Sequence, residues 1–474
     1  MTPYITNEQT TAYLCFNRNI RARLGEMPDT TSDSLINPHE RQALEKLLQF
    51  PLAEALFGRR SRRFALGGEL PEGPLAYRSR YEPYPLSELE RLLILTTVGG
   101  LTGWHNLISH HKNVAPHLPS YSGMAAGRTF PSAAGFHTSQ IFFTDDSGTY
   151  TFQTRDAHPP VPRNALGQVD VVELLLAHRQ YCHKLSDSRL YIPPREPYMA
   201  GHNAWNANKP GSLLVWPIAD VAQHQLLKLL FIAQNGFVLY DDVHNRSIPG
   251  LEKFKDYVAL DKPYPLTAFD QATLAEVSAE ISAAVFAGHL MQQAMGLGGW
   301  MLNGLDRVRT LGASGDPEVP GLGFRYDFKP GWSRPNPTGL EGIFEGYCPP
   351  HYPHMRAAVE ALVERKFGQG GPFHPETPGP WKEARAVRSQ AFPHEEWLIE
   401  VVATQAQYLF DTFGKFPATV PTIYSLMFLQ THHLDLEYYD RFFEPGAYLQ
   451  THREHLERWH GVRLEDLPRR DDSQ

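Results

Sequence analysis

Cysteine is scarce in this chain, and the cysteines that occur are not spaced for a shared role. Cys15, Cys182 and Cys348 lie far apart among the 474 residues and form no CxxC pair. This pattern argues against a thiolate metal cluster and against a disulfide-stapled secreted fold. It favours a reducing compartment.

Long apolar runs and an excess of positive charge are also missing. The N-terminus has no basic-then-apolar signal pattern, and no apolar run approaches the ~18 residues of a membrane span. The chain has 44 Lys and Arg against 52 Asp and Glu, which gives a formal net charge of -8. We therefore expect a cytoplasmic protein whose main partner is neither a membrane nor a nucleic acid.

Signature motifs of several enzyme classes do not occur either. There is no Walker phosphate loop and no GxSxG nucleophile elbow, and Gly321-x-Gly323 is too short for a dinucleotide-binding fingerprint. The composition, with 42% hydrophobic and 20% charged residues, is that of a globular protein. The length requires two cores or one large one.

Alternating helical and strand patterns predict an α+β or α/β domain. A helix capped by Ser87, with Glu90 at capping-box spacing, is predicted over residues 86–100. A hairpin that turns at Ser147-Gly148 follows. Further patterns predict a helix over 170–185, a strand over 212–220 and a helix over 221–236.

The composition of the sequence changes near residue 330, where Pro, Gly, His and Trp become frequent. Helical patterns return beyond residue 394 and include residues 422–443 and 449–460. We therefore divide the chain into an N-terminal helical arm (1–50), a main domain (51–330) and a Pro/Gly-rich connection with a helical C-terminal extension (331–474).

The longest predicted helix runs from Ala272 toward Trp300 and contains many small residues. Its apolar positions recur every three or four residues, and the sequence Gly-Leu-Gly-Gly from Gly296 ends it. Small side chains and glycines allow another backbone or a flat ring to lie close. The simpler interpretation is a core helix with a glycine cap.

Two further stretches carry polar chemistry. Arg59, Arg60, Ser61, Arg62 and Arg63 place four guanidinium groups and a hydroxyl within five residues. We call this stretch the basic segment. Guanidinium groups pair with phosphate oxygens in two-pronged fashion, so the basic segment suits a phosphate monoester. The alternative is a solvated basic turn.

The second stretch, Pro131-Ser132-Ala133-Ala134-Gly135, directly precedes a predicted strand. We call it the PSAAG loop. It could lay amides and a hydroxyl along the edge of a planar heterocycle, or it could be an ordinary loop that enters a strand. Together with the basic segment and the glycine-terminated helix, it is the pattern of a cradle for flavin mononucleotide (FMN).

The order RRSRRF, then RTFPSAAG before a strand, then a long helix that ends in AMGLGGW resembles the nitroreductase superfamily of FMN proteins. The form of the PSAAG loop is most similar to the SagB-type branch, which includes azoline dehydrogenases. The resemblance covers roughly residues 55–315. It implies an α+β fold with a nitroreductase-like central mixed sheet flanked by helices, and a homodimer that holds FMN at the subunit interface.

The resemblance also implies roles for individual residues. The basic segment would hold the FMN phosphate and ribityl chain, the PSAAG loop would lie along the isoalloxazine ring, and the two glycines after the long helix would present amides near the flavin. Arg325 is a weaker candidate for a second phosphate contact. The residues concerned are Arg59, Arg60, Ser61, Arg63, Pro131, Ser132, Ala133, Gly135, Gly298, Gly299 and Arg325.

The function implied is that of an FMN-dependent oxidoreductase that transfers hydride at flavin N5 to or from a small or peptide-borne organic substrate. NAD(P)H is one candidate electron donor, and the substrate itself is another. We find no match to the Lys-Tyr pair of the azoline dehydrogenases, so no catalytic residue is assigned. A non-catalytic flavin- or ligand-binding protein on the same scaffold is the alternative.

A metal enzyme is the third possibility. His432, His433, Asp435 and Glu437 lie close in sequence, and His433 and Glu437 would share one face of a helix. His452 and His455 form a second pair nearby. Residues that pack helices together are the simpler interpretation, and the sequence assigns no metal ligand. The loop from Gly201 to Ser212 could likewise be a substrate lid or an ordinary polar loop.

Overall fold

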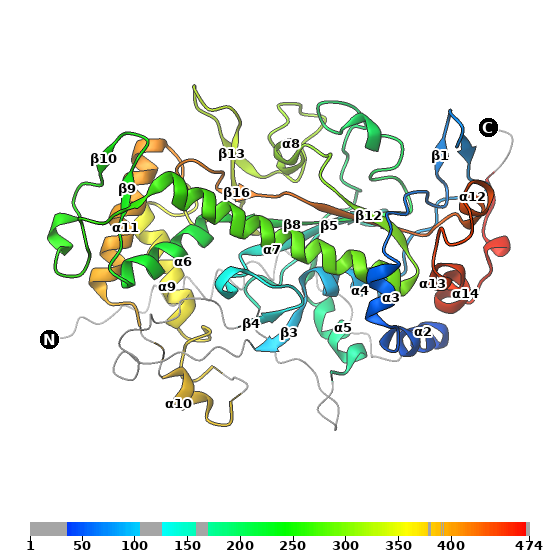
Figure 1. Ribbon diagram of the computed structural model, residues 1–474, viewed down its shortest axis with the longest axis horizontal. Helices are drawn as coiled ribbons and strands as arrows, with labels where there is room; N and C mark the ends of the chain where they lie inside the picture. Colours follow the sequence, from blue (N-terminus) through cyan, green and yellow to red (C-terminus); the bar gives the residue numbers. More distant parts are fainter. Residues whose placement is uncertain are drawn as a thin grey trace.

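The computed structural model describes residues 36–104, 126–157, 169–377, 381–389, 391 and 393–470. Cys15 and most of the predicted N-terminal arm lie outside these residues. The described chain is an α+β structure in which helices pack around one large sheet and four small ones (Figure 1). This confirms the α+β part of the prediction.

The large sheet has the strand order β12-β17-β8-β5-β6-β7, with β16 beside β17 on the same edge of β8. All of its strand pairs are antiparallel, so the prediction of a mixed sheet is wrong for the described residues. A parallel pair needs a crossover connection between neighbouring strands, whereas β5 and β6 meet through a tight hairpin. The bounds are β5 (Ser139–Asp145), β6 (Gly148–Phe152), β7 (Cys182–Ser186), β8 (Leu213–Asp220), β12 (Gly298–Leu302), β16 (Ile423–Tyr424) and β17 (Phe428–His432).

Both faces of the large sheet are covered. Along β8, Leu213 and Val215 point into one apolar cluster, and Leu214 and Trp216 point into another on the opposite face. Successive side chains of a strand alternate between faces, so this one fully buried strand contributes side chains to two apolar cores. This explains why residues 213–220 form a continuous apolar run rather than an alternating one.

The position of β17 corrects the helix predicted over residues 422–443. The sequence 422–443 was expected to be helical, but Phe428–His432 forms a strand between β12 and β8, and only Leu436–Phe442 (α12) is a helix. The C-terminal part of the chain therefore completes the large sheet and is not an appended helical extension. The helical spacing of its apolar residues was overridden by pairing with two buried strands.

A smaller correction concerns residues 170–185. The helix there, α5 (Val171–Arg179), ends earlier than predicted, and Cys182–Ser186 continues as the edge strand β7. The other strong predictions are confirmed. The helix α4 (Glu88–Gly99) begins with the Ser87 and Glu90 capping box, and the hairpin turns at Ser147-Gly148.

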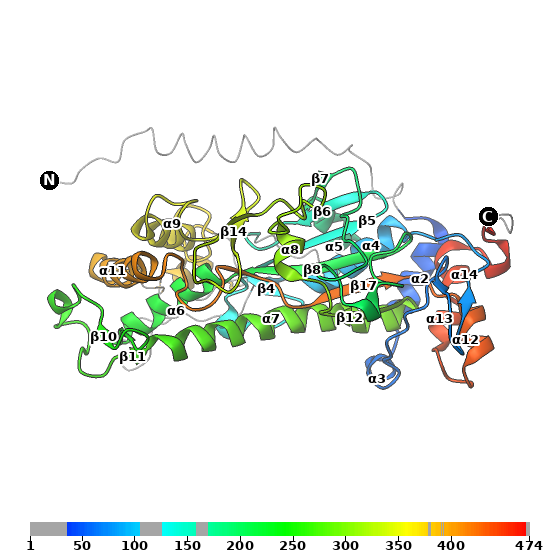
Figure 2. The ribbon, with the colours of Figure 1, turned by 90° about the horizontal axis from the view of Figure 1, so that it is seen from above.

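The long helix, α7 (Leu266–Met295), spans 30 residues along one edge of the molecule (Figure 2). It ends at Gly296, which adopts the left-handed conformation with φ 85°. Its length and mean hydropathy of 1.2 would also fit a membrane span. However, α7 packs on α4, α6 and the large sheet, and buries polar side chains such as Glu280 and Gln292, as a helix in a protein core does.

A third apolar core, built from helices, lies at one end of the large sheet, where α6, α9 and α11 pack together. We call it the helical core. The helices not yet bounded are α2 (Pro38–Leu48), α3 (Leu52–Phe57), α6 (Val221–Gln234), α8 (Arg307–Leu311), α9 (Met355–Phe367), α10 (Ala384–Arg388), α11 (Glu396–Phe413), α13 (Gln450–Arg453) and α14 (His455–His460). The small sheets are formed by β1 (Glu69–Leu70), β2 (Tyr77–Arg78), β3 (Leu101–Trp104), β4 (Ala126–Arg128), β9 (Leu239–Asp241), β10 (Arg246–Ser247), β11 (Tyr264–Pro265), β13 (Arg325–Asp327), β14 (Asn336–Leu340) and β15 (Phe344–Glu345).

The helical core contains a buried amine that predicts a pH dependence of stability. Lys366 is fully buried on α9 with its Nζ 2.9 Å from Nε2 of His394, and burial lowers the pKa of Lys366 to about 7. The unfolded chain keeps this proton up to its ordinary pKa of 10.5, so between pH 7 and 10 the unfolded state binds more protons. This group therefore makes the free energy of unfolding rise with pH.

We expect Lys366→Met to raise the free energy of unfolding at pH 7 by about 2–4 kcal/mol, because it removes the cost of keeping the amine buried. The rise in stability between pH 7 and 10 should become smaller. Urea unfolding at pH 7 and pH 9 measures both effects, with Lys255→Met at an exposed position as the control. Equal effects of the two substitutions would contradict this account.

Candidate functional site

The basic segment is fixed by backbone pairing to the strand that follows α7. The N–H of Arg62 donates to the carbonyl of Gly299 at 3.2 Å, and the N–H of Gly299 donates to the carbonyl of Arg62 at 2.8 Å. Two motifs that are more than 200 residues apart in sequence are thereby side by side. The structure thus brings together the basic segment and the glycines of the GLGG sequence.

Arg62 is the buried anchor of the basic segment. Its side chain is 2% exposed and donates to the side-chain oxygen of Gln293 and to the carbonyls of Ala447 and Gly58. Burial lowers the pKa of Arg62 to about 10, so the guanidinium is still charged at neutral pH. Arg62 is the one arginine of the segment that the sequence did not assign to the cofactor, and its role here is structural.

The neighbouring residues of the segment face solvent. Arg59, Arg60 and Ser61 are exposed, while the guanidinium of Arg63 lies 5.3 Å from the ring centre of Trp300. One guanidinium nitrogen of Arg59 lies 3.3 Å from Nε2 of His289, whose Nδ1 lies 2.9 Å from the side-chain oxygen of Gln292. That oxygen can only accept, so Nδ1 carries the proton and Nε2 accepts from Arg59.

His289 is therefore a site residue that the sequence analysis missed. Burial lowers its pKa, and the charges of Arg59 and Arg62 lower it further, so that the ring is neutral at pH 7 and can accept a hydrogen bond. The sequence signal was weak, because a lone histidine in an apolar helix is usually a packing residue. Only the fold shows that its ring meets the basic segment.

The charge of the basic segment is not balanced by acidic side chains. Among the described residues, no ion pair joins Arg59, Arg60, Arg62 or Arg63 to an aspartate or glutamate. Four guanidinium groups within five residues, with no carboxylate partner in the part of the chain that the structure describes, stand out in a chain with a net charge of -8. They are an electrostatic site for an anion.

The glycines after α7 do not offer their amides as the sequence suggested. The N–H of Gly299 is already used by Arg62, and Gly298 pairs with His432 in the sheet. Gly299 has a φ of 140°, and a side chain there would lie 2.0 Å from the carbonyl oxygen of Gln430. A glycine is needed at position 299 because its backbone lies close to those of Arg62 and Gln430.

The PSAAG loop is held by a buried carboxylate in the middle of α7. The hydroxyl of Ser132 bonds to Oε2 of Glu280, and Oε1 of Glu280 accepts from the N–H and hydroxyl of Ser139 at 2.9 and 2.6 Å. Pro131 is exposed, Ser132 and Ala133 are half-buried, and Gly135 is buried. The loop thus keeps a partly open edge, but the proton of its serine hydroxyl is committed to Glu280.

The basic segment and the PSAAG loop do not converge within one chain. They are attached to α7 through His289 and Glu280, which are nine residues apart. Nine residues correspond to about 14 Å along a helix and about half a turn around it. One chain therefore presents the two motifs on opposite sides of α7.

Arg325 is not brought to either motif. It is exposed on β13, 3.9 Å from Asp327, and β13 lies away from α3 and the basic segment in Figure 1. Nothing in the structure places it near the residues predicted to hold the phosphate in the same chain. It is a useful control position for experiments on the basic segment.

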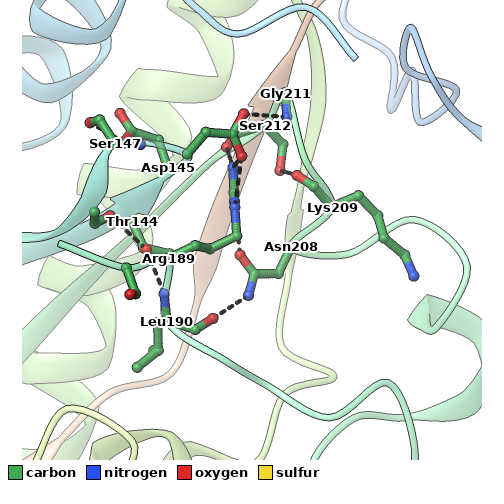
Figure 3. Close-up of polar contacts among 12 residues, drawn as sticks. Thr144, Asp145, Ser147, Arg189, Leu190, Asn208, Lys209, Gly211 and Ser212 are labelled. Carbon is green, nitrogen blue, oxygen red and sulfur yellow. Dashed lines mark hydrogen bonds and ion pairs between the residues drawn. The ribbon is translucent and has the colours of Figure 1, made fainter. Parts of the chain in front are cut away.

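The polar loop from Gly201 to Ser212 is anchored at its C-terminal end. Arg189 donates to the side-chain oxygen of Asn208 at 3.0 Å and to the carbonyl of Ser212 at 2.6 Å, and it pairs with Asp146 (Figure 3). Asn208 in turn donates to the carbonyl of Leu190 at 2.8 Å. These contacts favour a fixed polar loop over a substrate lid.

The C-terminal histidines gather differently from the prediction. Glu437 does not meet His433; it pairs with Arg80 and accepts from the hydroxyl of Tyr81 at 2.7 Å. His433 instead lies beside Glu90 of α4, together with His455 and His460. His432 and Asp435 are buried outside this cluster. The i, i+4 pairing considered as a metal alternative does not form, because residues 428–432 are a strand and the helix begins only at Leu436.

Comparisons with known proteins identify no family for this chain. No protein-family model and no curated protein matches it. Among solved structures it is similar to a protein from Ralstonia eutropha JMP134 described as a putative nitroreductase, with 12% sequence identity and a TM-score of 0.24. The match covers 60% of this chain and 76% of that chain. A likeness at this level identifies neither a cofactor nor a substrate.

The close packing at Gly299 gives a direct test of the anchored basic segment. We expect Gly299→Ala to lower the free energy of unfolding by about 2 kcal/mol or more, because the added methyl group collides with the Gln430 carbonyl and requires a strained backbone. Gly201→Ala is the control, since a side chain there meets nothing within 4 Å. Urea unfolding should separate the two variants clearly. If both were equally stable, the Arg62–Gly299 pairing would not be as tight as described.

Proposed function

We propose that this protein is an FMN-dependent oxidoreductase of the nitroreductase type. The observation that carries the proposal is the basic segment, whose arginines pair with no carboxylate in the described ranges and which is held beside the end of α7 by the Arg62–Gly299 pairing. Exposed Arg59, Arg60 and Ser61 supply the donors that a phosphate monoester needs. The residues present therefore fit the phosphate end of FMN.

When bound, FMN would supply hydride transfer at its N5 atom. The chain's own residues would bind and orient it. Arg59, held by His289, and Arg60 would pair with the phosphate, and Ser61 would donate its hydroxyl. The open edge of the PSAAG loop at Pro131 and Ala133 would pack against the ring. The Ser132 hydroxyl would keep the loop in shape through Glu280.

A homodimer is part of the proposal, because the two motifs lie on opposite sides of α7 in one chain. In a dimer, the basic segment of one subunit and the PSAAG loop of the other can face the same flavin. The exposed side of α7 is mostly small and apolar, with Ala268, Ala275, Ala279 and Phe286 at helical spacing and Gln271 as its one exposed polar residue. His289 follows Phe286 by three residues, so the basic segment borders the same side.

The helix α3 extends this apolar surface next to the basic segment. Leu52 and Phe57 are 66% and 83% exposed, and α3 packs on α7. Exposed apolar patches of this kind mark interaction surfaces in proteins. We therefore assign α3 and the exposed side of α7 to the subunit interface, with a second copy of this chain as the occupant.

The substrate is proposed only by class. A small or peptide-borne organic molecule would suit a SagB-type enzyme, and NAD(P)H or the substrate itself would reduce the flavin. Cytoplasmic localisation agrees with scarce cysteine. The non-catalytic alternative is a flavin-binding protein without turnover. It differs in one outcome, because its flavin would not pass through a cycle of reduction by a donor and reoxidation by an acceptor.

We expect Arg60→Ala to weaken FMN binding by about 10- to 100-fold, since it removes a charged hydrogen-bond donor to the phosphate. Arg325→Ala is the matched control and should leave FMN binding unchanged. Both can be measured by fluorescence titration of flavin-depleted protein. Riboflavin, which lacks the phosphate, should bind the two variants equally well. Equal FMN affinities of the two variants would refute the assignment of the basic segment.

The interface assignment has its own test. We expect Phe286→Glu to convert the dimer to a monomer and to lower FMN occupancy, because it places a charge in the apolar side of α7. Phe328→Glu, at another exposed phenylalanine, should change neither property. Light scattering coupled to gel filtration measures the mass. A Phe286→Glu variant that stays dimeric and keeps its flavin would contradict the proposed interface.

A further inference from the structure

Four side chains from three distant parts of the sequence meet at one buried point. Glu90 comes from α4, His433 follows β17, and His455 and His460 lie on α14. One ligand atom from each lies within 4.8 Å of all the others. Glu90 is 0% exposed, and His433 and His455 are 2% and 3% exposed. We call these residues the Glu–His cluster.

The ligand atoms of the cluster are close enough to surround one ion. Oε1 of Glu90 lies 2.7 Å from Nε2 of His455, 3.1 Å from that of His460 and 3.3 Å from that of His433. The Nε2 atoms of His433 and His460 are 3.3 Å apart. Ligand atoms placed tetrahedrally about 2.0–2.1 Å from zinc stand about 3.3 Å from each other.

Hydrogen bonds to residues outside the cluster orient three of the four side chains. Nδ1 of His433 lies 2.9 Å from the carbonyl of Tyr84, and Nδ1 of His455 lies 2.8 Å from the carbonyl of Met295. A carbonyl can only accept, so in the neutral rings the proton is on Nδ1 and Nε2 presents a lone pair to the cluster. Oε2 of Glu90 accepts from the N–H of Ser87 at 2.7 Å, which turns Oε1 inward. Metal ligands are commonly oriented in this way.

Hydrogen bonds within the cluster satisfy part of this arrangement, because Nε2 of His433 and of His460 lie at hydrogen-bond distance from Oε1 of Glu90. They do not satisfy His455. Nε2 of His455 is buried 2.7 Å from the Glu90 oxygen, yet within the described part of the chain it makes no hydrogen bond of acceptable direction. Two imidazole Nε2 atoms that face each other at 3.3 Å also cannot both carry protons without a clash. A cation at the common point would pair with all four lone pairs at once and neutralise the buried carboxylate.

We propose that Glu90, His433, His455 and His460 bind one divalent transition-metal ion, zinc by ligand type and geometry. Three imidazoles exclude magnesium and calcium, which prefer oxygen ligands. Four protein ligands fill a tetrahedral zinc ion, so the site is structural. It joins α14 and the end of β17 to α4 and thereby holds the C-terminal segment against the start of the main domain.

The proposal is independent of the flavin. The cluster shares no residue with the basic segment or the PSAAG loop, so metal binding is expected whether or not FMN is present. A small cavity of about 110 Å³ borders His433 and His455, and the side chain of His460 is 12% exposed. These features give an ion a route to the buried point.

The test uses the full chain. We expect one zinc ion per chain by elemental analysis of the purified protein. Chelation should lower the midpoint of thermal unfolding, and zinc but not magnesium should restore it. His455→Asn and His460→Gln should each weaken zinc binding by about 100-fold or more, judged from the effect of changes around other metal sites. His460 lies at the cluster's edge, so His460→Gln folds even if His455→Asn does not.

His452→Asn is the matched control, because His452 is equally buried on the neighbouring helix but outside the cluster. It should keep full zinc content. Replacement by cobalt(II) should give the intense visible absorption of tetrahedral coordination in the wild type and in His452→Asn, and lose it in His460→Gln. Folded wild-type protein that takes up neither zinc nor cobalt would overturn the proposal. Equal metal loss in His452→Asn and His460→Gln would overturn it as well.

Discussion

The end of α7 at Gly296 is the point on which most of the structure depends. Gly296 turns the chain in the left-handed conformation, and a side chain there would lie 2.1 Å from the carbonyl oxygen of Thr451. The last turn of the helix is then bound by other segments. The carbonyl of Gln293 accepts from the Thr451 hydroxyl at 2.8 Å, and that of Met295 accepts from His455. A helix end that is buried needs such partners for its free carbonyls.

Both candidate sites follow from this constraint. The basic segment is fixed where the strand after α7 begins, and the Glu–His cluster includes His455, which caps the end of α7. The two sites differ in the charge of the ligand that each one suits. The basic segment has the exposed guanidinium groups of Arg59 and Arg60, which pair with no carboxylate among the described residues and suit an anion. The cluster surrounds a buried carboxylate with imidazole nitrogens, which suits a cation.

Local sequence signals predicted local structure well. They failed where contacts between residues far apart in the sequence determine the secondary structure or the role of a residue. The capping box at Ser87 and Glu90 and the glycine end of the long helix depend on neighbours in sequence, and both are confirmed. The strand Phe428–His432 was taken for a helix because its partners, β12 and β8, lie more than 100 residues earlier. The roles of His289 and Glu90 were missed for the same reason, since each depends on a residue far away in the chain.

An absorption spectrum of the purified protein, before and after heat release of bound ligands, tests the central claim most directly. The account predicts flavin bands near 370 and 450 nm, roughly where free flavins absorb, and release of FMN with its phosphate intact. The same bands should appear after FMN is added to protein purified without it. A colourless protein that also fails to take up added FMN would contradict the proposed function. The basic segment would then be a site for another anion.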